Sequence, residues 1–156
     1  MMIAAGFAIA AIVLVGLLAG VHLTGIAALN RALRALPATS YIQVKQSMDR
    51  ELPRLAAPLT ISSIAAMLGA AITAALAGCT AAAIVAAIGT IAGLVALLAV
   101  LRGDLPINKQ MDTWDPATPP ADWQLLRHRW ERFFQVRAIA VLTAFGCLVA
   151  AGALLR

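Results

Sequence analysis

Long stretches without any charged residue alternate with shorter polar stretches along the chain. Each charge-free stretch approaches or exceeds the roughly 20 apolar residues that a helix needs to cross a bilayer. The fourth stretch follows directly on a charged segment, and both fit one long helix. The pattern therefore predicts four transmembrane helices, over about residues 3–29, 55–77, 81–101 and 123–155. The expected fold class is an all-α, integral membrane four-helix bundle that forms a single domain over residues 1–156.

The composition supports a membrane protein and excludes a soluble one. Of the 156 residues, 62% are hydrophobic and only 12% are charged, whereas about a quarter of a soluble domain is charged. The net charge of +5 would suggest a nucleic-acid partner in a soluble chain. Here the basic residues flank apolar spans, so we expect contact with the lipid bilayer and no nucleic-acid partner.

The charges also predict how the chain is oriented. Because successive spans alternate in direction, the polar segments 30–54 and 102–122 lie on one side of the membrane. The turn near Gly78 on the other side is uncharged and short, which favours an up-down bundle. The positive-inside rule places the charged segments in the cytoplasm and both termini outside the cytoplasmic membrane. The last helix, at about 33 residues, is longer than a bilayer needs, so its first turns should protrude into the cytoplasm.

Local signals predict where some of these helices begin and bend. Ser40 and Gln43 have the spacing of a capping box and predict a helix start in the first polar segment. Pro53 and Pro58 predict a kink near the start of the second span. Asp122 is a predicted N-cap for the last helix.

Two glycine pairs have the small-xxx-small spacing that permits close helix contact in lipid. They are Gly16 with Gly20 and Gly89 with Gly93. In a chain this rich in alanine and glycine, chance is an equally good explanation for each pair. The spacing alone leaves the two alternatives open.

Three polar side chains near the charged side require an explanation. His22 is the only imidazole inside an apolar span, so it is either a functional group or an interfacial histidine bonded to a neighbouring helix. Asp49 shares a helical face with Lys45, which favours an ion pair over catalysis. Arg137 immediately precedes a long apolar stretch and needs a carboxylate, a backbone carbonyl or an anionic ligand.

The three tryptophans and the single tyrosine lie on the charged side only. These residues are Tyr41, Trp114, Trp123 and Trp130. They form either an interfacial belt or the lining of a pocket for a flat aromatic ligand. On the last helix, four residues fall on one face by their spacing: Arg127, Trp130, Phe134 and Arg137.

Metal ligation has little support in the sequence. The two histidines form no motif with metal-ligand spacing, and the remaining candidate set is His22, His128 and Asp49. A site for copper, iron or haem stays an alternative on that set. Cys79 and Cys147 lie too far apart in the predicted topology to form a disulfide.

Several short motifs together resemble a family of small four-span membrane proteins that includes the anthrone oxygenases of aromatic polyketide pathways. The motifs are the segment 41–49, the Leu-Pro-Ile-Asn of 105–108, Trp114, and the segment 122–137 with its Arg-Trp and Val-Arg pairs. The resemblance covers the whole chain in span order. It implies a membrane oxygenase that acts with molecular oxygen as co-substrate, without metal or flavin, on a flat aromatic or quinone-like lipophile.

That chemistry assigns expected roles to residues at the charged end. A base must remove an acidic methylene proton, and polar or cationic groups must stabilise the resulting anion. The expected catalytic residues are His22, Asp49, Asn108 and Arg137. The expected substrate-binding residues are Tyr41, Lys45, Trp114, His128, Arg129, Trp130 and Phe134.

Three other functions remain open from the sequence. The first is a non-catalytic binding or scaffold protein that presents a hydrophobic compound to a soluble enzyme. The second is a metal- or haem-dependent membrane redox protein. The third is a small exporter, which would need a homo-oligomer because four short spans without paired charges at the membrane midplane provide no path.

Overall fold

The computed structural model describes residues 1–155 and leaves Arg156 outside the described part. Its elements are α1 (Met2–Thr24), η1 (Gly25–Leu29), α2 (Asn30–Arg34), α3 (Ala38–Leu76), α4 (Thr80–Ala99), η2 (Val100–Asp104), α5 (Leu105–Asp112) and α6 (Trp123–Ala153). Because η1 and η2 are single π-helical turns, α1 continues into α2 and α4 continues into α5. The described chain therefore forms four helical rods, each long and apolar enough to span a membrane. This confirms the predicted all-α four-helix bundle.

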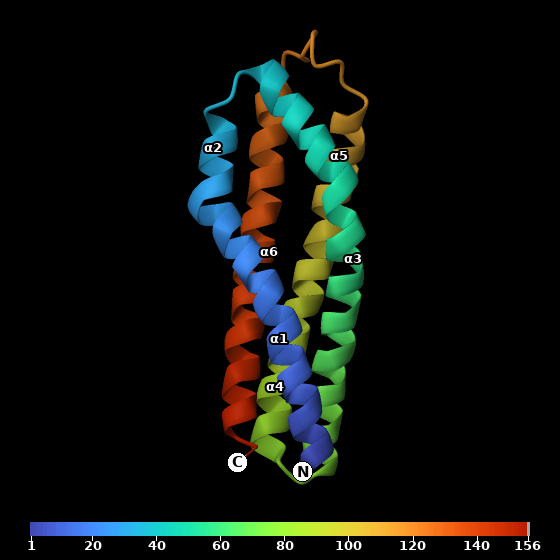
Figure 1. Ribbon diagram of the computed structural model, residues 1–156, viewed down its shortest axis with the longest axis vertical. Helices are drawn as coiled ribbons and strands as arrows, with labels where there is room; N and C mark the ends of the chain where they lie inside the picture. Colours follow the sequence, from blue (N-terminus) through green and yellow to red (C-terminus); the bar gives the residue numbers. More distant parts are fainter. Residues whose placement is uncertain (156) are drawn as a thin grey trace.

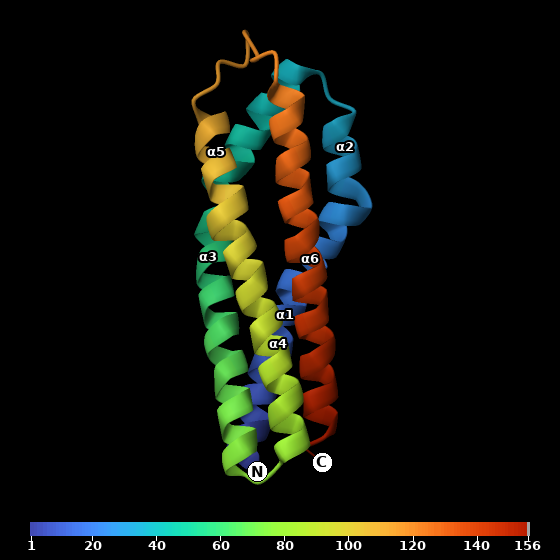
Figure 2. The ribbon, with the colours of Figure 1, turned by 180° about the vertical axis from the view of Figure 1, so that it is seen from behind.

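The rods pack in the order in which they occur along the chain. α1 and α4 each contact both α3 and α6, which gives an up-down arrangement with antiparallel neighbours. Both chain ends and the turn between α3 and α4 lie at one end of the bundle, and the other two connections lie at the opposite end (Figures 1 and 2). The tight turn depends on Gly78, whose φ of 76° is in the left-handed region that favours glycine.

The rods are longer than a hydrocarbon layer is thick. They contain 33, 39, 33 and 31 residues, or about 46 to 58 Å at the helical rise, against about 30 Å of hydrocarbon. All four rods therefore extend beyond an apolar layer at the end that carries the charged residues, which we call the polar end. The extension predicted for the last helix is therefore shared by the other three rods, and the α6 rod is the shortest of the four.

The helix starts agree only partly with the local sequence signals. α3 begins at Ala38, with Pro37 at its N-cap, so the predicted capping box at Ser40 and Gln43 is wrong. Asp122 does occupy the N-cap position of α6, as predicted. α3 passes through both of its prolines without interruption, and Figure 1 shows its first part crossing obliquely before the helix straightens.

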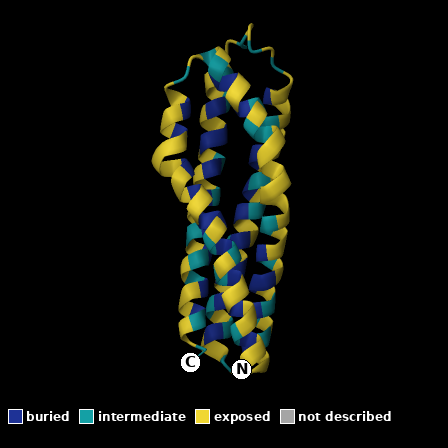
Figure 3. Cartoon of the chain, in the orientation of Figure 1, coloured by how far each residue is buried: buried dark blue, intermediate teal, exposed yellow. Residues whose placement is uncertain are grey.

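The interior and the outer surface of the bundle have different residues. The core between the apolar parts of the rods consists mainly of alanine with Val15, Met67, Val141 and Leu148. Many large isoleucine, leucine and valine residues are instead exposed, and Figure 3 shows exposed positions along the outside of every rod. An apolar outer surface of this extent is unusual for a soluble protein, and small core residues allow close helix packing in lipid. The outer surface therefore fits contact with a lipid bilayer.

Only one of the two predicted glycine pairs lies at helix contacts. A Cβ at Gly89 would lie 3.1 Å from an α6 side chain, and a Cβ at Gly93 would lie 2.5 Å from the Met67 side chain of α3. The pair therefore contacts two different helices. A Cβ at Gly20 would meet nothing within 4 Å, so Gly16 and Gly20 do not form a joint contact surface.

The two π turns fit against two consecutive phenylalanines of α6. A Cβ at Gly25 in η1 would lie 2.3 Å from the Phe134 ring, and a Cβ at Gly103 in η2 would lie 2.2 Å from the Phe133 ring. Both glycines are buried. The rings thus occupy space that any larger residue would need. Single π turns of this kind are frequent at functional sites.

Candidate functional site

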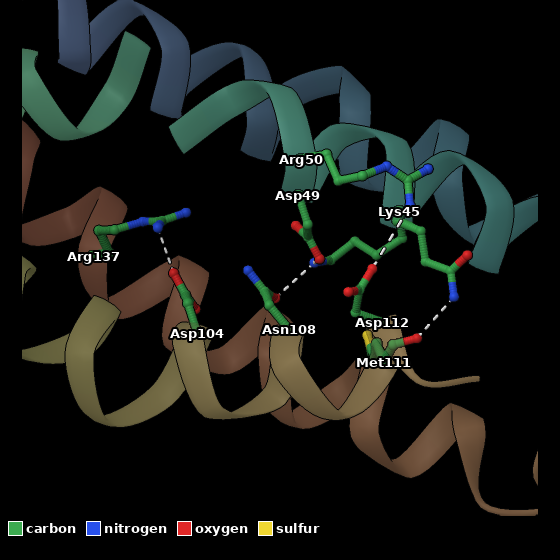
Figure 4. Close-up of polar contacts among 9 residues, drawn as sticks. Lys45, Asp49, Arg50, Asp104, Asn108, Met111, Asp112 and Arg137 are labelled. Atoms are coloured by element: carbon green, nitrogen blue, oxygen red, sulfur yellow. Dashed lines mark hydrogen bonds and ion pairs between the residues drawn. The ribbon is translucent and has the colours of Figure 1, made fainter. Parts of the chain in front are cut away.

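Polar side chains from three of the four rods gather inside the polar end of the bundle. Figure 4 shows Arg137 of α6 and Asp104 of η2 beside Asn108 of α5, with Lys45 and Asp49 of α3 next to them. All five come from segments next to the ends of the apolar stretches. The helix periodicity and the antiparallel packing bring these separate segments together.

Asp104 and Arg137 form a buried ion pair between η2 and α6. The Asp104 side chain is 3% exposed and the Arg137 side chain is 20% exposed. The guanidinium carbon also lies 5.0 Å from the centroid of the Phe134 ring. A carboxylate is one of the three partners predicted for Arg137. The Arg137 Nε has no hydrogen-bond partner among the described residues.

Lys45 is almost completely enclosed, at 1% exposure. Its ammonium group forms the predicted ion pair with Asp49 and donates a hydrogen bond of 2.7 Å to Oδ1 of Asn108. The ammonium also lies 4.6 Å from the centroid of the Trp130 ring. Both residues lie beyond the apolar stretches, and burial lowers the pKa of Lys45 and raises the pKa of Asp49. Their mutual attraction opposes both shifts.

The His22 ring is buried against α6. Its Nδ1 lies 2.7 Å from the carbonyl oxygen of Leu18, and its ring stacks on Phe134 with 5.6 Å between centroids. A carbonyl oxygen only accepts hydrogen bonds, so this contact assigns the proton of a neutral imidazole to Nδ1. The Nε2 of His22 then carries a free lone pair, and it has no partner among the described residues.

A small cavity lies between the rods beside His22. Its volume is about 40 Å³, and His22, Thr60 and Arg137 supply its polar lining among apolar side chains from all four rods. That volume is enough for about three water molecules. It is well below the roughly 300 Å³ or more of typical ligand pockets. A larger molecule would therefore require the surrounding side chains to move.

A layer of aromatic side chains lies between this cavity and the polar end of the bundle. Phe134 packs against Trp130, with 5.4 Å between ring centroids, and both residues are buried together with Tyr41. Trp114 is half-buried, and its carbonyl oxygen accepts a hydrogen bond from Gln46 at 2.9 Å. Tyr41 and Trp130 are buried inside the bundle, which argues against an interfacial belt for these two, and neither of them lines the cavity.

None of the predicted substrate-binding residues lines the cavity, and two of them lie on the outside of the bundle. His128 and Arg129 are exposed on the outer side of α6. The Nδ1 of His128 lies 3.7 Å from Glu131, a contact that is an ion pair only when the imidazole is protonated. Within residues 1–155, no three histidine, cysteine or acidic side chains come together as a metal site, so His22, His128 and Asp49 are not joined.

Several residues at the polar end had no role in the sequence analysis. Asp104 is the partner of Arg137, and its position just after the third apolar stretch matches the depth of Arg137 just before the fourth. Arg34 donates three hydrogen bonds to Glu131, at 2.9, 3.1 and 2.7 Å, and joins α2 to α6. Antiparallel packing brings such pairs together. The sequence could have indicated them, because the two members of a pair lie at a similar distance from the polar ends of their apolar stretches.

No family model, curated protein or solved structure matches this chain. Its class therefore follows from its architecture, which is a four-helix bundle built to span a membrane. A buried polar cluster and a small cavity distinguish the polar end of that bundle.

Proposed function

We propose that the protein is a membrane oxidoreductase of the anthrone-oxygenase type. It would act with molecular oxygen on a flat, lipophilic aromatic or quinone-like substrate, and it would need no metal or organic cofactor. The observation that carries the proposal is the unpaired Nε2 of His22 at a cavity that Arg137 also lines. A base and a cation at one buried site are the two groups that proton removal from a weak carbon acid requires.

His22 suits the role of general base. Its Nδ1 is held by the Leu18 carbonyl oxygen, and its ring is held against Phe134. These contacts fix both the tautomer and the orientation of the ring, as an orienting partner does in other histidine bases. Nε2 would then take a proton from the central methylene carbon of the substrate.

Arg137 suits the role of anion stabiliser. Removal of the proton places negative charge on the carbonyl oxygen of the substrate, and the free Nε–H of Arg137 can donate to it. Asp104 balances the charge of Arg137 in the resting protein. Lys45 is paired with Asp49 and donates a hydrogen bond to Asn108, and these three are positioning residues in this scheme.

The reaction balances without another reductant. The carbanion gives an electron to dioxygen, and the two radicals combine into a carbon-bound peroxide that takes its proton back from His22. His22 then removes the second hydrogen from the same carbon as a proton. The O–O bond breaks, the carbon becomes a carbonyl, and hydroxide leaves with that proton as water. One substrate and one dioxygen thus give one quinone and one water.

The charge distribution supports an orientation of the bundle as part of this proposal. The charged segments 30–54 and 102–122 would face the cytoplasm, and both termini would lie outside. Substrate would then enter from the bilayer or from the cytoplasmic end. Because the cavity is only about 40 Å³, binding would require the apolar side chains that line it to move.

Oxygen uptake by the purified protein tests this function. We expect an anthrone to be oxidised faster than in protein-free detergent, with one dioxygen consumed for each quinone formed. Under ¹⁸O₂, one labelled oxygen should appear in the quinone, and a chelator should leave the rate unchanged. A rate equal to the protein-free rate would refute the enzyme and favour a binding or scaffold protein. Loss of activity on chelation, with bound metal in the sample, would favour the metal-dependent alternative.

A further inference from the structure

Arg127 differs from the other buried basic side chains at the polar end. Lys45 is paired with Asp49, and Arg137 is paired with Asp104. Arg127 is only 9% exposed, yet within residues 1–155 it has no carboxylate partner and donates no hydrogen bond. Buried charges in proteins are nearly always paired. The fully buried Nε–H of Arg127 therefore has no acceptor among the described residues, which leaves it free to donate to an anion.

The surroundings of Arg127 leave one edge of the guanidinium free. Its central carbon lies 4.8 Å from the Trp123 ring centroid and 5.6 Å from the Tyr41 ring centroid. Those rings cover the faces of the group but accept none of its in-plane hydrogens. The acid one helical turn away, Glu131, is already bound at both oxygens by Arg34.

Other unpartnered polar atoms belong to the same part of the bundle. The Tyr41 hydroxyl and the Trp130 Nε1 are buried without a hydrogen-bond partner among the described residues, as is the Nε of Arg127. Burial raises the pKa of Tyr41, which keeps its hydroxyl protonated and able to donate. Buried donors without partners are rare and usually mark a missing water or ligand.

Contacts place these donors between α3 and α6. Tyr41 lies one helical turn before Lys45 on α3, and Arg127 lies one turn before Trp130 on α6. Tyr41 faces Arg127, and Lys45 faces Trp130. The two pairs follow one another along the bundle, so the three donors share one region at its polar end.

We propose that Arg127, Tyr41 and Trp130 bind the oxyanion of an organic ligand, a carboxylate or a phenolate on a flat aromatic molecule. The proposal rests on the proposed function and narrows its substrate class to aromatic molecules with an ionised oxygen at one edge. A guanidinium edge with two neutral donors suits an oxyanion, because each donated bond to it is charge-assisted.

The spacing of the two sites supports one ligand reaching both. Arg127 lies seven residues before Phe134 on α6, or about 10 Å along the helix. Phe134 stacks on His22 beside the cavity, and the Trp130 ring lies between Phe134 and Arg127 in sequence. A fused tricyclic ring system is of about that length. Its reacting carbon would lie at His22 and its charged edge at Arg127.

Binding of two isosteric probes tests the proposal. Anthraquinone-2-carboxylate carries the charge, and anthraquinone-2-carboxamide has the same shape without it. Quenching of tryptophan fluorescence in detergent reports their dissociation constants. We expect the wild-type protein to prefer the carboxylate by about tenfold or more. Arg127→Gln should abolish that preference, and Tyr41→Phe, which keeps the ring, should reduce it severalfold.

The matched control is Arg129→Gln, which removes the same charge from the exposed side of the same helix. This variant should keep the wild-type preference. If Arg127→Gln and Arg129→Gln lowered the preference for the carboxylate probe equally, the proposal would be overturned. The preference would then come from the overall positive charge of the protein surface. Displacement of the carboxylate probe by inorganic phosphate at comparable affinity would also overturn it, since the site would then bind a free inorganic ion.

The two proposals fail separately. Oxygen uptake with an uncharged anthrone, measured on the same variants, reports the enzyme alone. If the protein takes up oxygen but Arg127→Gln keeps the wild-type preference for the carboxylate probe, only the anion site is refuted. A carboxylate preference that depends on Arg127 in a protein without oxygen uptake upholds the anion site and refutes only the oxygenase.

Discussion

Replacement of Gly25 by alanine tests the packing that holds His22. Gly25 lies in the π turn η1, where an added Cβ would be 2.3 Å from Cζ and 2.8 Å from Cε1 of Phe134. Such separations are far below van der Waals contact, so the Phe134 ring must move. It has little room, because it is buried between His22 and Trp130. The substitution therefore strains the same stack that orients the His22 ring.

The magnitude follows from two opposed effects. Overpacking of a well-filled core costs about 1–3 kcal/mol, and alanine gains up to about 1 kcal/mol over glycine in a helix. Gly20→Ala receives the same gain without the clash, because nothing lies within 4 Å of its Cβ position. The difference in unfolding free energy between the two variants is therefore the clash itself, about 1–3 kcal/mol.

Unfolding of both variants by SDS in mixed micelles, followed by circular dichroism, measures that difference. Gly25→Ala should unfold at a lower SDS fraction than wild type or close to it, and Gly20→Ala at an equal or higher fraction. Adding Phe134→Leu to Gly25→Ala removes the ring and should recover part of the loss. Equal stability of the two single variants would refute the assignment of Phe134 to the space beside Gly25.

Three further predictions concern charge and topology. Asp104→Asn leaves Arg137 buried without its counter-ion and should destabilise the protein by roughly 3–5 kcal/mol. The double variant with Arg137→Gln should lose less stability than the sum of the two single variants, and additive losses in SDS unfolding would contradict the ion pair. Glu131→Gln should cost only about 0.5–1 kcal/mol, because Arg34 is 47% exposed, and this loss should shrink at high salt; a loss as large as that of Asp104→Asn would contradict it. Cys79, in the turn between α3 and α4, should react with a membrane-impermeant maleimide on intact cells; labelling only after lysis would reverse the proposed orientation.

Features that depend on local spacing were predictable from the sequence. The four charge-free stretches defined the four rods. The spacing of four along α3 identified the Lys45–Asp49 pair. The periodicity of α6 placed Arg127, Trp130 and Phe134 on one buried face. The same periodicity makes the intervening His128 and Arg129 face outward, and both are exposed.

Features that depend on contacts between distant segments were not predictable from the sequence. The two π turns accommodate Phe133 and Phe134, which are more than a hundred residues from Gly25. The start of α3 at Ala38 was also missed, because the extended Pro37 stands at the N-cap without any side-chain cap that a sequence pattern could indicate. The pairing of Asp104 with Arg137 could be predicted only if the alignment of the two rods along the bundle axis were known, and only the assembled bundle determines that alignment.

The rate of oxygen uptake with an anthrone, compared between His22→Asn and His128→Asn, tests the central claim most directly. Asparagine at residue 22 retains a donor for the Leu18 carbonyl oxygen but has no basic nitrogen. His128 is the only other histidine, and it is exposed on the outer side of α6. The account predicts a loss of about 10²-fold or more for His22→Asn and a wild-type rate for His128→Asn. A folded His22→Asn variant with the wild-type rate would contradict it.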